Sequence, residues 1–82
     1  MIEFRIDYIN RKFENIKEEV DNGKLLVFAK WEVEDLLRRT IELNAFIETE
    51  QEKQELNALI KQLEQYLNEI EGLIEKDVPH TL

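Results

Sequence analysis

Residues 56–74, LNALIKQLEQYLNEIEGLI, hold the most regular pattern in this chain of 82 residues. Large apolar side chains recur at alternating steps of four and three residues: Leu56, Ile60, Leu63, Leu67, Ile70 and Ile74. This spacing puts them on one face of an α-helix and is typical of a coiled-coil seam. Three more residues, spaced by seven, widen the stripe: Leu59, Tyr66 and Leu73. A stripe this wide contacts two neighbours, so we expect residues 50–76 to form the central helix of a bundle.

The start of this helix is marked by the sequence Thr49-Glu50-Gln51-Glu52, which has the form of a capping box. We therefore expect the helix to begin near residue 50. Neither glycine nor proline separates it from the segment before, so a helix that runs continuously through residue 48 is the alternative. Gly72 lies inside the pattern, where it costs up to about 1 kcal/mol relative to alanine.

The N-terminal segment repeats the same alternating spacing over nearly three heptads. Its apolar positions are Ile2, Ile6, Ile9, Phe13, Ile16 and Val20. The positions beside this narrow seam are polar or charged, as a two-helix contact requires. Gly23 follows where a left-handed residue would end a helix. We expect a helix over residues 2–22.

The middle segment contains the densest apolar run, Leu25 to Ala29, followed closely by Trp31. Since the chain offers no second strand candidate, a lone strand would leave its backbone groups unpaired, and we expect a helix over residues 25–48. An irregular connector packed over the end of the bundle is the alternative for the run itself. A helical wheel gives the core face as Leu26, Ala29, Val33, Leu36, Leu37, Thr40, Ile41, Asn44 and Ile47.

Together these patterns predict an all-α protein: a small three-helix bundle with coiled-coil-like seams, formed by residues 1–76 as a single domain, with a flexible tail over residues 77–82. So short a chain buries only about 60–65 % of its unfolded surface, and it has no cysteine for a disulfide. A third helix of about 40 Å would overhang its partners. The overhang carries Leu67, Ile70, Leu73 and Ile74. We expect these residues to be exposed in a monomer and to join a homo-oligomer, a dimer being favoured; the narrow seam of residues 2–22 is the alternative self-interface.

Charge restricts the partners. The chain has a net charge of −8, and its last 35 residues hold nine acids against three bases. Such a surface repels phosphates and anionic lipids, which argues against direct binding to nucleic acids or membranes. The first residues resemble no signal peptide, and the apolar run is far shorter than the roughly 20 residues that span a bilayer. We expect a cytoplasmic protein.

The residues that enzymes use are mostly missing. There is no serine or cysteine, and His80, the single histidine, lies beyond Pro79 near the end of the chain. We therefore predict no enzyme activity, no catalytic residue, no cofactor and no metal. Two pairs of carboxylates, Glu32 with Asp35 and Glu52 with Glu55, have a spacing that can hold Mg²⁺. A carboxylate- and Mg²⁺-dependent all-α hydrolase is thus a remote alternative.

Aromatic side chains are more numerous than a simple core needs. On the wheel of the middle helix, Phe28, Trp31 and Phe46 project away from the core face, together with Arg38 and Arg39. Aromatic residues and arginine are enriched in protein interfaces, so we predict a non-enzymatic protein-interaction module, a small regulator, adaptor or inhibitor, that binds through these five residues. Trp31 capping the end of the core is the structural alternative.

A second functional hypothesis uses the acidic third helix. Carboxylates such as Glu64, Glu71 and Glu75 could imitate the phosphates of a nucleic acid and block a DNA-binding protein. Binding of that kind weakens steeply with ionic strength, whereas an interface centred on aromatic side chains responds little.

Overall fold

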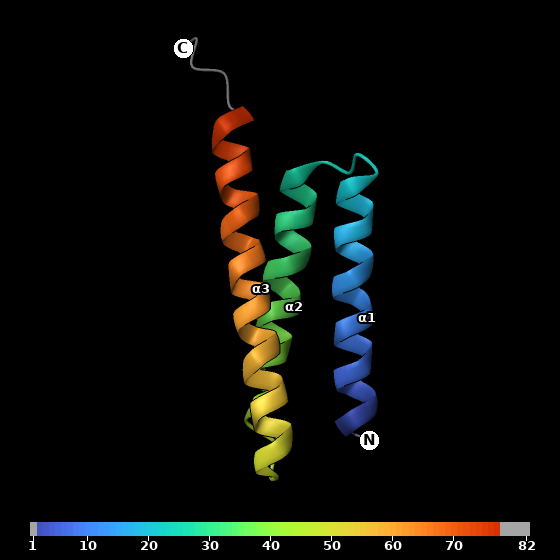
Figure 1. The fold of residues 1–82 in the computed structure, drawn as a ribbon, viewed down its shortest axis with the longest axis vertical. Helices are drawn as coiled ribbons and strands as arrows, with labels where there is room; N and C mark the ends of the chain where they lie inside the picture. The colour runs from blue at the N-terminus through green and yellow to red at the C-terminus, as the bar shows by residue number, and fades with distance from the viewer. Residues whose placement is uncertain (1, 78–82) are drawn as a thin grey trace.

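The computed structural model describes residues 2–77, with side chains described for residues 6–76. It confirms an all-α fold of three packed helices: α1 (Ile2–Asp21), α2 (Leu26–Asn44) and α3 (Glu50–Asp77). The helices lie side by side, α1 and α3 running in one direction and α2 in the other (Figure 1). Helix α3 continues through Asp77, one residue past its expected end. The other residues of the predicted tail, including Pro79 and His80, lie outside the described residues.

The heptad positions of α1 and α3 form the core, as their spacing predicts. Leu56 and Leu63 are fully buried, and Ile9 and Phe13 are nearly so. Helix α2 adds Ala29, Val33 and Leu36 from its inner face. Its buried Thr40 hydroxyl donates a hydrogen bond to the carbonyl oxygen of Leu36 at 2.7 Å, so this polar group enters the core with its bonding satisfied.

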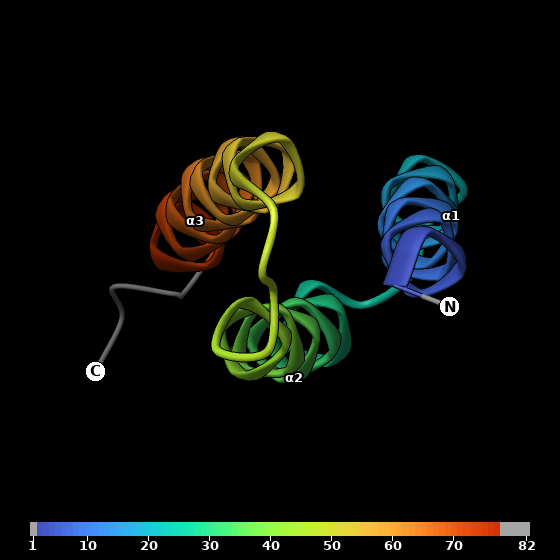
Figure 2. The same ribbon diagram turned by 90° about the horizontal axis from the view of Figure 1, so that it is seen from below.

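The central helix is α2, and the expectation that α3 would be central is wrong. Helix α2 makes its most extensive contacts with α3 and the next most with α1, whereas α1 and α3 touch each other least. Viewed along the bundle, α2 lies at the corner of the arrangement, with α1 and α3 on the same side of it (Figure 2). The wide apolar stripe of α3 does reach both neighbours, but only weakly on the α1 side.

The contact between α1 and α3 centres on two aromatic rings. Phe13 and Tyr66 meet edge to face, with ring centroids 5.5 Å apart, a favourable geometry for aromatic pairs. The ammonium group of Lys17 lies 4.4 Å from the centroid of the Phe13 ring. Leu59, from the same added stripe, is buried, but Leu73 is 47 % exposed. Of the extra stripe, Leu59 and Tyr66 therefore pack in or against the core and Leu73 does not.

Helix α1 ends at Asp21, and Gly23 stops it, as the sequence predicts. Gly23 has φ of +101°, in the left-handed region that glycine tolerates. Its N–H donates to the Val20 carbonyl at 3.0 Å, and the N–H of Lys24 donates to that of Glu19 at 2.9 Å. These two bonds form a Schellman motif, which satisfies the last carbonyls of the helix and reverses the chain toward α2.

The two glycines give opposite expectations for replacement by alanine. Neither would bring a new Cβ within 4 Å of another atom, so only backbone preference decides the result. Gly23→Ala is expected to lower the free energy of unfolding by about 1–2 kcal/mol because alanine resists positive φ. Gly72→Ala, inside α3, should raise it by about 0.5–1 kcal/mol. Urea denaturation followed by circular dichroism tests both; shifts of the same sign would contradict the assignment of Gly23 as the helix-ending residue.

The apolar run of residues 25–29 forms the start of α2, with Leu25 at the N-cap position. Leu26 and Ala29 face the core as predicted, but Ile41 does not, because it is 51 % exposed. Each helical residue turns by about 100° from the one before. Ile41 therefore points well away from the fully buried Thr40. The helical wheel therefore assigned too many residues of α2 to the core.

Helices α2 and α3 are separate, and α2 ends at Asn44, four residues before the expected end. The N–H groups of Ala45, Phe46 and Ile47 each donate to the carbonyl three residues earlier, which tightens the last turn. Ile47 nevertheless remains buried in the core. Thr49 then caps α3, as predicted: the backbone N–H of Glu52 donates to Thr49 Oγ1 at 3.4 Å. The Glu52 carboxylate accepts from the Thr49 hydroxyl and not from the Thr49 backbone N–H, so one of the two bonds of a capping box forms.

Candidate protein interface

The outer face of α2 is the side of the helix that does not enter the core, and one edge of it borders the groove between α1 and α2. We define it by residues spaced three or four apart along α2 and the turn that follows: Phe28, Trp31, Asp35, Arg38, Arg39, Glu42 and Phe46. It includes all five residues that the sequence predicts to bind a partner. None of the seven is buried.

Phe28 and Trp31 form a pair near the start of this face. They are one helical turn apart, and their rings meet edge to face with centroids separated by 5.6 Å. Phe28 is 47 % exposed and Trp31 58 %. Trp31 thus remains largely in solvent, which argues against the alternative that it caps the core. Two large rings fixed against each other form a preorganised apolar surface, of the kind that anchors protein interfaces.

Two residues missed by the sequence prediction extend this apolar area. Leu25 precedes Phe28 by three positions and Val27 precedes Trp31 by four, so each lies next to an aromatic ring on the helix surface. Leu25 is 65 % exposed and Val27 43 %. Both belong to the dense apolar run, and a five-residue run cannot place every side chain on the inner face of a helix. This excess of apolar side chains over inner-face positions was the sequence signal that could have identified Leu25 and Val27 as exposed.

Arginine and aspartate occupy the middle of the outer face. Asp35 accepts from both arginines of the predicted set: Arg39 Nε lies 3.0 Å from Asp35 Oδ2, and Arg38 bonds to the other carboxylate oxygen. Arg38 and Arg39 are mostly exposed, and Asp35 is partly buried. Ion pairs of this kind contribute little to folding stability.

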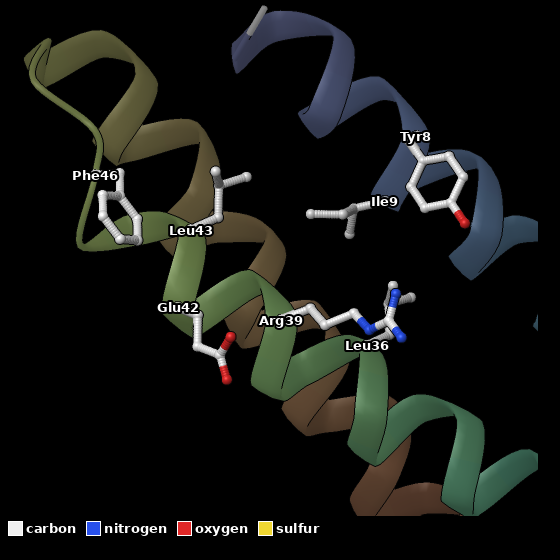
Figure 3. Close-up of a pocket in the computed structure, with 7 residues that line it drawn as sticks. All are labelled: Tyr8, Ile9, Leu36, Arg39, Glu42, Leu43 and Phe46. Atoms are coloured by element: carbon white, nitrogen blue, oxygen red, sulfur yellow. The ribbon is translucent and has the colours of Figure 1, made fainter.

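Phe46 lies at the far end of the outer face, in the turn after α2, and is 73 % exposed. It is about 20 Å from Trp31 along the helix axis, so the structure does not bring the predicted aromatic residues together at one point. Phe46 instead lines a shallow groove of about 340 Å³ between α1 and α2, with Ile9, Leu43 and Arg39. Tyr8 stands on the opposite wall of this groove (Figure 3).

A lysine fixes the start of α2 to the end of α1. The Lys24 ammonium lies 3.0 Å from a carboxylate oxygen of Glu19 and also bonds to Glu32. The hydrogen bonds to Glu32 and then Glu19 raise the pKa of Lys24 above its ordinary value. These contacts hold the Phe28 turn in a set position relative to α1.

The pKa of a second group, the Tyr66 phenol, is raised mainly by burial and further by Asp21 and Glu69. Ordinary lysine and tyrosine side chains titrate at about pH 10. Because the folded state holds both protons more tightly than the unfolded state, the associated stability is complete below about pH 10 and is lost as pH rises through the folded-state pKa values.

Tyr66→Phe is therefore expected to make the alkaline fall in unfolding free energy shallower than in the wild type. Urea denaturation midpoints measured from neutral pH to about pH 11 test this. Tyr8→Phe, which removes an exposed phenol from α1, is the matched control. Identical alkaline curves for Tyr66→Phe and the wild type would contradict the expectation.

The apolar overhang predicted on α3 is much smaller than expected. Ile70 is only 1 % exposed, so the expectation that it is open in a monomer is wrong. Leu67 and Ile74 are partly buried and pack against the core. Of the four predicted residues, Leu73 alone is as much as 47 % exposed. The core reaches further along α3 than helix length suggests, because Ile70 continues the buried row of Leu56 and Leu63.

The two carboxylate pairs lie on different helices, Glu32 and Asp35 on α2 and Glu52 and Glu55 on the first turns of α3. Glu32 bonds to Lys24 near the α1–α2 turn, whereas Glu52 takes part in the cap of α3 at the other turn. Within residues 2–77, no group of three or more potential metal-binding side chains is found. The structure therefore does not assemble the two pairs into one site.

The acidic residues of α3 were the second functional candidate. Glu64 and Glu75 are exposed, and Glu71 is partly buried. No ion pair among the described side chains of residues 6–76 involves any of the three.

In the described part of the chain, no helix combines the length and apolar character needed to cross a bilayer.

Comparison of the chain with protein-family models, with curated proteins and with solved structures finds no match.

Proposed function

We propose that the protein is a non-enzymatic binding module that contacts another protein through the outer face of α2. The observation that carries this proposal is the preorganised Phe28–Trp31 pair, largely exposed on a helix whose opposite face supplies the core. Burying such rings against a partner removes a large apolar area from water. Arg38, Arg39 and Phe46 continue the contact along the same face.

A photo-activated crosslinker tests the proposal directly. A benzophenone amino acid placed at Phe28 is expected to give a covalent protein adduct in an extract of the source cells. The same group at Gln65, an exposed position of α3, is the control and should give none. Trp31→Ala in the Phe28-labelled chain should reduce the yield severalfold. Equal adducts at both positions, or none at Phe28, would contradict the proposed face.

Ionic strength separates this proposal from imitation of a nucleic acid. Adduct formation centred on the aromatic pair should persist as salt is raised. Adducts that disappear at high salt and form at Glu64, Glu71 or Glu75 positions on α3 would support the acidic helix as the binding surface instead.

A further inference from the structure

We propose that the partner of the outer face of α2 is a second copy of this chain, bound antiparallel about a two-fold axis that passes between Asp35 and Arg38. This inference rests on the proposed function and specifies its partner. The sequence pattern predicted self-association through the overhang of α3, where Ile70 is buried. The proposal places self-association on α2 instead.

Charge balance favours α2 as the self-interface. The chain carries a net charge of −8, so two copies repel each other through most of their surfaces. Residues 24–44 are the exception, with four basic and four acidic side chains. In contrast, α3 carries three bases against eight acids over residues 50–77. Two copies can therefore meet along α2 without bringing together surplus negative charge.

The order of charges along α2 is self-complementary. The outer face follows steps of three and four residues through Phe28, Trp31, Asp35, Arg38 and Glu42, the spacing of a helix–helix seam. In an interface with two-fold symmetry, residue i of one copy meets residue j of the other and j meets i. An axis between Asp35 and Arg38 places the carboxylate of each copy opposite an arginine of the other, twice.

The same axis places aromatic residues at both ends of the contact. Phe28 lies near the start of α2, and the axis places it opposite position 45 of the other copy. It is therefore one residue from Phe46, which follows the end of α2. Trp31 falls opposite Glu42, beside that phenylalanine. All three aromatic side chains are 47–73 % exposed in the single chain. Pairing removes two equivalent apolar clusters from water, one on each side of the central charges.

In the single chain, Asp35 already bonds to Arg38 and Arg39. These internal bonds hold the guanidinium group of Arg38, whose side chain is 68 % exposed, whereas Arg39 also lines the groove between α1 and α2. Arginine has five donors and can bind carboxylates on two sides, so each pair can add a carboxylate from the other copy without losing its own. The dimer thus needs no rearrangement of the charged residues seen in the structure.

Reversal of charge tests both the face and the orientation. The first variant is Asp35→Lys, and the second carries Arg38→Glu with Arg39→Glu. Each puts like charges opposite one another in a homodimer, so each is expected to weaken self-association by on the order of a hundredfold. Mixing the two variants restores opposite charges at both crossings, and a mixed dimer should form.

Sedimentation equilibrium measures the masses over a range of protein concentrations, and native mass spectrometry identifies the mixed dimer. Matched controls make the same charge changes at exposed positions of α3: Glu64→Lys for the first variant and Lys53→Glu with Lys61→Glu for the second. We expect the wild type and both controls to be dimers, and each variant alone to be a monomer. Recovery of the dimer on mixing also shows that both variants are folded.

Several results would overturn the proposal: a wild type that stays monomeric, variants that dimerise as well as the controls, or a mixture that stays monomeric. The crosslinking experiment at Phe28 distinguishes failure of the dimer proposal from failure of the proposed function. A monomeric wild type whose Phe28 crosslinker still captures a different protein leaves the α2 interface standing with another partner. A monomer without any adduct at Phe28 contradicts both.

Discussion

Replacing Phe13 by alanine is expected to lower the free energy of unfolding by about 3–5 kcal/mol. Phe13 is 3 % exposed, contacts the Tyr66 ring and lies under the ammonium group of Lys17. Alanine would leave a cavity where α1 meets α3, the weakest of the three helix contacts. Because small domains have a total stability of only about 5–15 kcal/mol, this change removes a large share of it.

Phe46→Ala is the matched control, since it deletes the same side chain from a position that is 73 % exposed. Its effect should stay within about 0.5 kcal/mol. Urea denaturation of both variants at low protein concentration, where self-association contributes least, gives the comparison. Losses of similar size would mean that Phe13 does not hold α1 in the bundle.

Leu63→Ala is the second large effect, with an expected loss of about 2–5 kcal/mol. Leu63 is fully buried at the middle of α3, and α3 makes the most extensive helix contact of the bundle with α2. The backbone on either side is helical, so the site cannot collapse freely around the lost methyl groups. Leu73→Ala, on the same helix but 47 % exposed, should cost far less. The thermal midpoint and the urea midpoint should both fall for Leu63→Ala, and an unchanged midpoint would contradict this packing.

The helices themselves could be predicted from local signals. Alternating steps of three and four identify the buried rows of α1 and α3 because side-chain direction in a helix depends only on sequence spacing. Gly23 and Thr49 mark helix ends for equally local reasons, a positive φ and a side-chain cap. What could not be predicted is which helix lies in the middle, since that depends on how three apolar faces fit together. The width of the stripe on α3 suggested the wrong helix.

The candidate interface, too, could be predicted only in part from local sequence signals. The wheel correctly set Phe28, Trp31 and Phe46 outside the core, because each lies far around the helix from the fully buried Val33. The wheel wrongly placed Ile41 in the core, and it contains no information about the distance between residues along the helix axis. Phe46 and Trp31 therefore read as one cluster in the sequence, although they occupy opposite ends of α2. Ile70 was misjudged because helix length alone does not show how far neighbouring side chains cover a surface.

The position of α2 between its two chain neighbours also bears on how fast the protein reaches its native state. The extensive contacts join α1 to α2 and α2 to α3, and each pair is linked by only a few residues. Contacts close in sequence require little loop closure before they form. We therefore expect folding in microseconds to milliseconds, the range of helical bundles with low contact order. The exposed apolar side chains of the unfolded chain would be open to aggregation only briefly.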